Sequence, residues 1–301
     1  MSRGFPPYVI LFSGVLIAST ASILIRVAQQ EGMSSLGIAA GRLGMAALIL
    51  APIAWSQAGN ELRSLDRRAI LLGMGSGVFL ALHFASWISS LAYTSVASSA
   101  ALVSTNPLWV GIASLLIFRE RLSLATISGI GFTLLGAILI AVSDSSSEAA
   151  TQHTAPLLGN SLALLGALTG TGYFLIGRDL RRRLSLLAYI WLVYTSAAVV
   201  LGVWAWLSGQ PLLGYSPLAY LCVLGLAIGP QLLGHTAFNW SLRYLSATFV
   251  TVAILGEPVG SALLALAFFR EWFAPLQLLG FVILLFGIAI ASVGESRSKT
   301  A

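Results

Sequence analysis

The segment HFASW, residues 83–87, places a histidine one helical turn from a tryptophan inside an apolar run. An imidazole can exchange a proton or form hydrogen bonds, and an indole can stack on an aromatic ligand. Residues four apart share one face of a helix, so Phe79, His83 and Trp87 form an aromatic stripe. We expect this stripe to contact a substrate; the alternative is that His83 is an ordinary core histidine.

A second histidine, His235, lies in a similar apolar run, where the same spacing adds Gln231 and Asn239 to its face. Amide groups both donate and accept hydrogen bonds. An aromatic wall facing an amide wall suits a small molecule with a large side chain and a charged end. We therefore predict that the two faces bind the same substrate.

Asn106 and Glu257 each precede a proline, Pro107 and Pro258, near the middle of an apolar run. A proline inside a helix leaves one carbonyl without its donor, and a kink of this kind beside a polar side chain suits a substrate site. A carboxylate facing lipid costs about 2.5–3.5 kcal/mol or more. Glu257 is therefore expected to face a cavity, or else to be protonated and bonded to a neighbouring helix.

Four further residues are candidates on weaker grounds. Trp109 lies one turn from Asn106, too deep for the interfacial belt, and either packs in the core or contacts substrate. Tyr173 is a further candidate contact. Gly77 and Gly229 belong to pairs with small-xxx-small spacing, which lets helices approach closely, and gating motion at these glycines and at the two prolines is a second possible role.

Motifs for enzymatic chemistry are missing from the sequence. It has neither the His-Glu-x-x-His pattern of a metalloprotease nor a glycine fingerprint after a strand, and it lacks acidic clusters for a magnesium diphosphate. The single cysteine, Cys222, lies in an apolar run, so a disulfide framework and a thiolate metal site are both excluded. We expect no enzymatic activity, no cofactor and no bound metal.

Composition identifies the elements that must position these residues. The chain is 57% hydrophobic and only 9% charged, against about 25% charged in soluble domains. A bilayer span needs about 20 apolar residues, and the backbone in lipid must satisfy its own hydrogen bonds, so we predict an all-α membrane protein. The ten predicted spans are residues 6–25, 34–55, 69–91, 96–118, 122–143, 157–177, 186–208, 216–240, 245–269 and 274–293.

The positive charges predict the orientation. Of the sixteen Lys and Arg residues, all but Arg26, Arg42 and Arg270 fall on one face of the ten-span arrangement. Positive loops stay on the cytoplasmic side, so both termini are expected in the cytoplasm of a bacterial-type cell, with the chain in the inner (plasma) membrane. The basic run RDLRRR at 178–183 is then a topology determinant, and no nucleic-acid partner is needed to explain it.

The second half of the chain repeats the first. At an offset of 152, residues 72–89 match residues 224–241 at seven of eighteen positions, and the two histidines coincide. At an offset of 151 the prolines 107 and 258 coincide, as do the FRE tripeptides at 118–120 and 269–271. The predicted organisation is a first repeat at 1–143, a linker at 144–156 and a second repeat at 157–301.

Each predicted repeat has five spans, so the second copy enters the membrane from the opposite side. Inverted repeats of this kind are typical of secondary transporters, in which a site between the halves opens alternately to either side. A passive channel or facilitator pore is the alternative. Channels usually have a continuous polar lining, whereas here the polar groups gather in the middle.

The stretches NPLWVGIASLLIFRERLSLATISGIGFTLLGAILI (106–140) and EPVGSALLALAFFREWFAPLQLLGFVILLFGIAI (257–290) resemble the EamA family of the drug/metabolite transporter superfamily. They share its mid-helix proline, its glutamate at the end of the fourth helix and its glycines in the fifth. The resemblance implies ten helices, export of metabolites from the cytoplasm, and a central cavity lined by the third, fourth, eighth and ninth spans.

The histidine and tryptophan content further resembles YddG-type exporters of aromatic amino acids. We therefore expect export of amino acids, aromatic or broadly neutral, by alternating access. The alternative within transporters is an exporter of cationic drugs or polyamines, with Glu257 as the only counter-charge. The expected partners are a small-molecule substrate and membrane lipid, with the monomer as the working unit.

Overall fold

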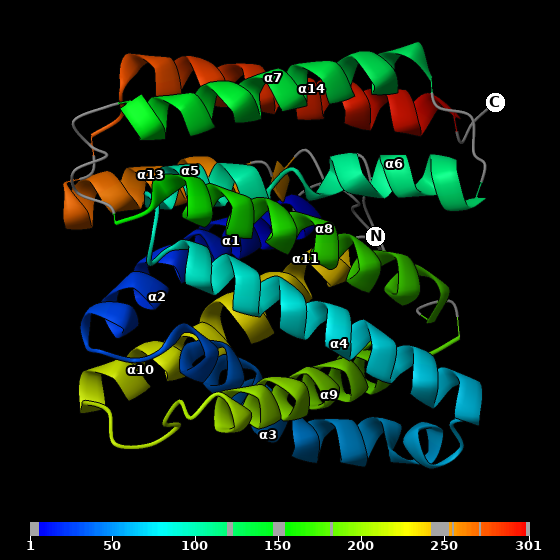
Figure 1. Ribbon diagram of the computed structural model, residues 1–301. Helices are drawn as coiled ribbons and strands as arrows, with labels where there is room; N and C mark the ends of the chain where they lie inside the picture. Colours follow the sequence, from blue (N-terminus) through cyan, green and yellow to red (C-terminus); the bar gives the residue numbers. More distant parts are fainter. Residues whose placement is uncertain are drawn as a thin grey trace.

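The structure is a computed structural model, and it describes residues 6–118, 123–146, 154–180, 183–241, 253–254, 256–270 and 272–298. Throughout this part of the chain the secondary structure is helical and contains no strand, which confirms the predicted all-α class. The helices lie roughly along one common direction, stacked across the molecule (Figure 1). The start of α1 and the end of α14 both lie toward the right-hand side of Figure 1, in different layers of this stack.

The helix bounds, in chain order, are α1 (Pro6–Ser19), α2 (Ala21–Gln30), α3 (Ser35–Arg63), α4 (Arg67–Ser90), α5 (Val96–Val103), α6 (Asn106–Phe118), α7 (Leu124–Ser146), α8 (Pro156–Leu180), α9 (Leu186–Leu207), α10 (Pro217–Leu226), the π-helix η2 (Ala227–His235), α11 (Thr236–Ser241), α13 (Gly256–Phe269) and α14 (Pro275–Ser298).

Serine caps fix where several of these helices begin. The hydroxyl of Ser95 accepts a hydrogen bond from the backbone N–H of Ser98 at the start of α5. Ser216 caps α10 in the same way, and Pro217 follows at the first helical position, where its missing N–H is no loss. The helices therefore start where the sequence supplies an acceptor for their free N–H groups.

Several helices are long and apolar enough to cross a bilayer. Shorter apolar helices at Ile127–Ile140, Val259–Phe269 and Pro275–Ile290 accompany them. This is the pattern of a multi-pass membrane protein. The long stretches are Pro7–Gln30, Ser35–Arg63, Arg67–Ser90, Leu186–Leu207 and Pro217–Phe238.

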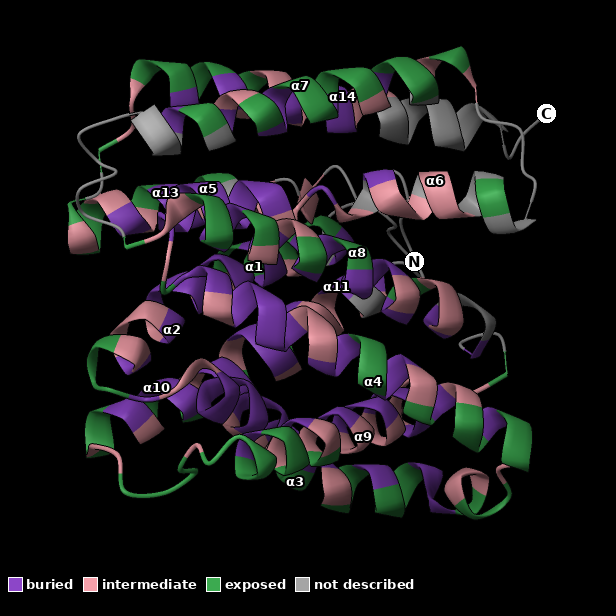
Figure 2. Cartoon of the chain, in the orientation of Figure 1, coloured by how far each residue is buried: buried purple, intermediate pink, exposed green. Residues whose placement is uncertain are grey.

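Helices α7 and α14 pack closely along one edge of the molecule, at the top of Figure 1. A Cβ added to Gly136 would lie 2.6 Å from the backbone nitrogen of Leu284, and one added to Gly287 would lie 2.7 Å from the carbonyl oxygen of Gly129. These glycines are the ones that coincide between the two repeats, and here they let two backbones touch. The face of α7 that points away from the rest of the molecule is largely exposed (Figure 2).

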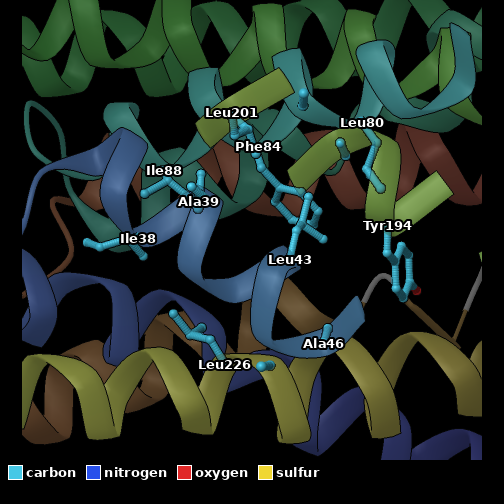
Figure 3. Packing of buried hydrophobic residues seen from close by; sticks show 14 of the residues in the cluster. Ile38, Ala39, Leu43, Ala46, Leu80, Phe84, Ile88, Tyr194, Leu201 and Leu226 are labelled. Carbon is cyan, nitrogen blue, oxygen red and sulfur yellow. The ribbon is translucent and has the colours of Figure 1, made fainter. Parts of the chain in front are cut away.

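The main apolar core lies at the opposite side, where α3, α4 and α9 meet. Leu43 from α3, Phe84 from α4 and Tyr194 from α9 are almost completely buried in it. Figure 3 shows these side chains converging. α4 packs against α8 on its other side, while α1 packs against η2, α11 and α13. The centre of the molecule is thus enclosed by α1, α3, α4, α8 and η2.

Regular helix is interrupted at two places near this centre. The helical stretch 96–118 breaks at Ser104 and Thr105, between α5 and α6, just before the Asn-Pro pair that predicted a kink. The stretch 217–241 passes through nine residues of π-helix, with Pro230 inside it. π-Helical segments are rare and frequently accompany functional sites.

Candidate functional site

The aromatic stripe predicted on α4 faces α8. The His83 Nδ1–H donates a hydrogen bond of 2.7 Å to the carbonyl oxygen of Gly166. The His83 ring stacks on Trp87, with 6.1 Å between centroids and 27° between planes. A Cβ on Gly166 would lie 3.3 Å from that of Trp87, so the glycine lets α8 approach the stripe. Phe79, the third member, is 38% exposed.

Asn106 joins His83 beside the same face of α8. Its Nδ2 donates a hydrogen bond of 2.7 Å to the carbonyl oxygen of Ala167. A Cβ on Gly170 would lie 2.5 Å from Asn106 Nδ2 and 2.9 Å from His83 Nδ1. The two polar groups are therefore neighbours, and the absence of a side chain at Gly170 makes room for both.

Arg42 is the residue that the sequence analysis failed to select. It lies on α3, and its side chain is completely buried. Its Nε–H donates a hydrogen bond of 2.8 Å to Oε1 of Gln231. Its guanidinium carbon lies 4.2 Å from the centroid of the Phe84 ring and 5.9 Å from that of Trp87. Through Arg42, Trp87 of the aromatic stripe is linked to Gln231 of the amide stripe.

The amide wall is carried by the π-helix. Gln231, only 1% exposed, lies in η2 next to Pro230, and it also interacts with the Tyr194 hydroxyl. His235 is the last residue of η2, and its ring meets the edge of Phe238 at 5.8 Å. Asn239 follows on α11, but its side chain lies outside the described residues.

Charged groups share this region. Glu257, in the first turn of α13, is close enough to Arg42 for an electrostatic interaction, and Arg42 is in turn within such range of His83 and His235. The side chain of Glu257 is partly exposed. The carboxylate expected to be the only charge in the middle of the membrane therefore has a guanidinium as a neighbour.

Two other candidate contacts have partners within the protein. The Trp109 Nε1–H donates a hydrogen bond of 3.1 Å to the hydroxyl of Thr105, at the break between α5 and α6. Tyr173 is 8% exposed, and its ring stacks on Tyr189 with 6.3 Å between centroids. Ser76 donates to the Tyr173 carbonyl oxygen, so this tyrosine links α8 to α4 and α9.

The predicted hinge residues differ in their surroundings. A Cβ on Gly77 would lie 3.0 Å from the carbonyl oxygen of Val193, which fits the packing role. A Cβ on Gly229 would meet only Ile17, at an ordinary 3.6 Å. The side chains of Pro107 and Pro258 lie outside the described residues. A gating role for all four remains a prediction.

The arrangement brings donors, acceptors and rings together without the groups a metal centre needs. Throughout the described ranges no group of three or more His, Cys, Asp or Glu residues is placed to hold a metal ion. What the cluster offers is a guanidinium, a carboxylate, two imidazoles, two amides and an indole. Groups of this kind bind small polar molecules by hydrogen bonds and charge.

Comparison with known proteins identifies the class. The EamA-like transporter family matches the chain twice, over residues 6–142 and 157–293. The chain belongs to this family. A solved crystal structure with 17% sequence identity superposes with a TM-score of 0.66, over 97% of this chain and 98% of the other, which shows that the fold is shared.

Curated relatives of this EamA-like protein are also transporters. An uncharacterized transporter of Archaeoglobus fulgidus is 24% identical over 94% of both chains. An uncharacterized transporter of Synechocystis sp. is 22% identical, over 82% of this chain and 74% of the relative. Family and relatives confirm the resemblance seen in the sequence and indicate a transport role rather than an enzymatic one, in a multi-pass membrane protein.

A direct indication of Arg42 was present in the sequence. Placing an arginine eight residues inside a predicted apolar span costs free energy, and such residues usually have a function and a partner. The charge pattern distinguishes Arg42 only as one of three basic residues off the positively charged face. Its burial depends on the tilt and neighbours of α3, which the sequence does not specify.

Proposed function

We propose that this EamA-like protein is a secondary transporter that exports small metabolites, namely aromatic or broadly neutral amino acids, by alternating access. Its site is the cluster around Arg42, Gln231, His83 and Glu257. The observation that carries this proposal is a fully buried guanidinium bonded to an amide and flanked by aromatic rings, inside a chain that is 57% hydrophobic.

Helix packing supports two inverted repeats of five spans each. In this proposal α1 with α2, α5 with α6, and α10 with η2 and α11 each form one span, which gives ten in all. α4 of the first half packs against α8, the first helix of the second half. The segment aligned with α4, η2, packs against α1, the first helix of the first half. A twofold relation between the halves requires both contacts. In Figure 1, α1 and α8, the first helix of each half, run in opposite directions.

The substrate follows from the two walls. His83 and Trp87 offer stacked rings for an aromatic side chain, while Asn106 offers an amide and Glu257 a carboxylate for an ammonium group. A cationic drug or a polyamine fits less well, because the positive charge of Arg42 already lies near Glu257 and would repel a cationic substrate. This charge arrangement is the reason to favour amino acids over cations.

Orientation and assembly complete the proposal. The positive residues at the ends of α3 and α8 favour cytoplasmic termini in the inner (plasma) membrane, with the monomer as the working unit. Cysteine labelling from one side tests this. Cysteines placed at Arg63 and Ser298 should react from the same side, and reaction from opposite sides would contradict the ten-span arrangement.

The decisive test of transport uses the purified protein in liposomes. Preloading with unlabelled phenylalanine should accelerate uptake of labelled phenylalanine, and the initial rate should saturate. Empty liposomes and liposomes with heat-unfolded protein are the controls. Conductance without saturation, and no effect of preloading, would identify a channel instead of a carrier.

A further inference from the structure

Within the described residues, two buried donors at the centre of the molecule have no acceptor. Nη1 of Arg42 and Nε1 of Trp87 are both buried and have no hydrogen-bond partner in the part of the chain that the structure describes. Both side chains are enclosed, Arg42 completely and Trp87 with 5% exposed. Buried donors are almost always satisfied, so two open ones on neighbouring side chains call for an explanation.

The two donors come from different helices that meet at this point. Arg42 is on α3 and Trp87 on α4, and the guanidinium carbon lies 5.9 Å from the indole centroid. A hydrogen bond from nitrogen to oxygen spans about 2.9 Å. A carboxylate has two oxygen atoms, so it can supply one acceptor to each of two such donors.

We infer that Arg42 and Trp87 form a subsite for the carboxylate of the substrate. This inference rests on the proposed function. It adds which end of the substrate, the carboxylate, Arg42 and Trp87 recognise. A guanidinium presents N–H groups in a planar fork that matches a carboxylate, and Nε–H is already used by Gln231, which fixes the plane of the fork.

Charge selects the class of ligand. Arg42 and Glu257 lie within electrostatic range of one another, so the site carries one group of each sign. A zwitterion satisfies both, with its carboxylate at Arg42 and its ammonium at Glu257. A dianionic phosphate would meet the repulsion of Glu257, and a simple amine would leave Nη1 of Arg42 without an acceptor. The subsite therefore selects α-amino acids over their amides and amines.

The test compares phenylalanine with phenylalaninamide, which keeps the ring and the ammonium but lacks the carboxylate. Each competes with labelled phenylalanine for uptake into proteoliposomes. In the unaltered protein we expect the acid to compete about 10- to 100-fold better than the amide, as for a charge-assisted hydrogen bond. In Arg42→Met this preference should fall to less than about threefold.

Matched variants separate this role from a structural one. Arg63→Gln alters an exposed arginine on the same helix, which also lies over an indole, 5.7 Å from the Trp55 ring, and it should keep the full preference. Arg42→Lys keeps the charge without the fork and should give an intermediate value. If Arg42→Met does not fold, Arg42→Lys decides the question.

The indole donor is tested by Trp87→Phe, which keeps an aromatic ring and removes Nε1. The preference for the acid should fall about 3- to 10-fold, the value of one neutral hydrogen bond. Trp206→Phe is the control, because Trp206 is 74% exposed on α9. An unchanged preference in both Arg42→Lys and Trp87→Phe would overturn the inference while leaving transport intact.

Failure of the proposed function has a different signature. If the unaltered protein takes up no phenylalanine, amino-acid transport is refuted, and binding in detergent then decides the inference. Thermal unfolding is measured with 3-phenylpropionate and with its amide. Stabilisation by the acid alone, lost in Arg42→Met, supports the carboxylate subsite, and equal effects of acid and amide refute it.

Discussion

Helix α4 and the segment formed by α10, η2 and α11 align at an offset of 152 but fold differently. α4 is one regular helix of 24 residues, whereas the second segment changes to π-helix for nine. His83 and His235 occupy equivalent positions, yet one lies on an aromatic wall and the other on an amide wall. The two repeats thus keep a histidine at the equivalent position, while the residues around it differ and form an aromatic wall in one copy and an amide wall in the other.

Two adjacent differences between the segments bear directly on the helix type and on Arg42. Where α4 has Val78 and Phe79, the second copy has Pro230 and Gln231. Proline cannot donate the usual helical hydrogen bond, which favours a local change of helix type. Gln231 then reaches Arg42 from within the altered segment. The amide wall therefore depends on a change that the aromatic wall does not contain.

Exchanging the first position should have the largest effect. Val78→Pro places a proline inside the regular helix α4, where it removes a backbone hydrogen bond and should destabilise the protein by about 3 kcal/mol or more. The thermal unfolding midpoint in detergent measures the loss. Pro230→Val is the matched exchange and should cause no such loss, because valine can donate its N–H. Equal destabilisation by both variants would show that the two segments do not differ in this way.

Exchanging the second position should have the next largest effect. Gln231→Leu removes the acceptor of the buried Arg42 Nε–H, and a buried donor without a partner costs about 1–3 kcal/mol. The free energy of unfolding should fall by that amount. Phe79→Leu changes the equivalent residue on α4, which is 38% exposed, and should stay within about 0.5 kcal/mol. A larger loss at Phe79 than at Gln231 would reverse the assignment of the two walls.

The paired glycines Gly77 and Gly229 differ in the space around them. Gly77→Ala brings a methyl group to 2.5 Å from Cβ of Ser196 and 3.0 Å from the carbonyl oxygen of Val193, so α9 must shift, and overpacking of this kind costs about 1–3 kcal/mol. Gly229→Ala meets Ile17 at 3.6 Å, and it should be neutral or stabilise by up to about 1 kcal/mol through better helix propensity. Unfolding midpoints of both variants test this, and a loss at Gly229 as large as that at Gly77 would contradict it.

The sequence alone was sufficient for the all-α class, and its site residues remain a prediction. His83, Asn106, Gln231 and Glu257 were selected because they are polar residues in apolar runs, and the structure brings His83 and Asn106 together beside α8. The family match over both halves confirms the resemblance on which the transporter class was based. Polarity in an apolar context was the informative property.

Arg42 and the π-helix were not predicted, for two physical reasons. The repeat indicates residues that occur at equivalent positions in both halves. The residue 152 positions after Arg42 is Tyr194, so the arginine has no charged equivalent in the second half. Pro230 marks a disturbance, but the choice of π-helix over a simple kink depends on the packing of α1 and α3 against this segment. Contacts between distant parts of the chain decide both features.

The smallest expected effect concerns the histidines themselves. His83→Ala removes the hydrogen bond to the Gly166 carbonyl and the stacking on Trp87, and it should lower phenylalanine uptake about 3- to 10-fold. His235→Ala should change uptake less than about threefold, because its wall retains the Gln231 amide. Quantifying each variant in the membrane separates transport from abundance. If His235→Ala lowers uptake more than His83→Ala at equal abundance, the aromatic wall is not the main surface for the side chain, and the amide wall takes that role.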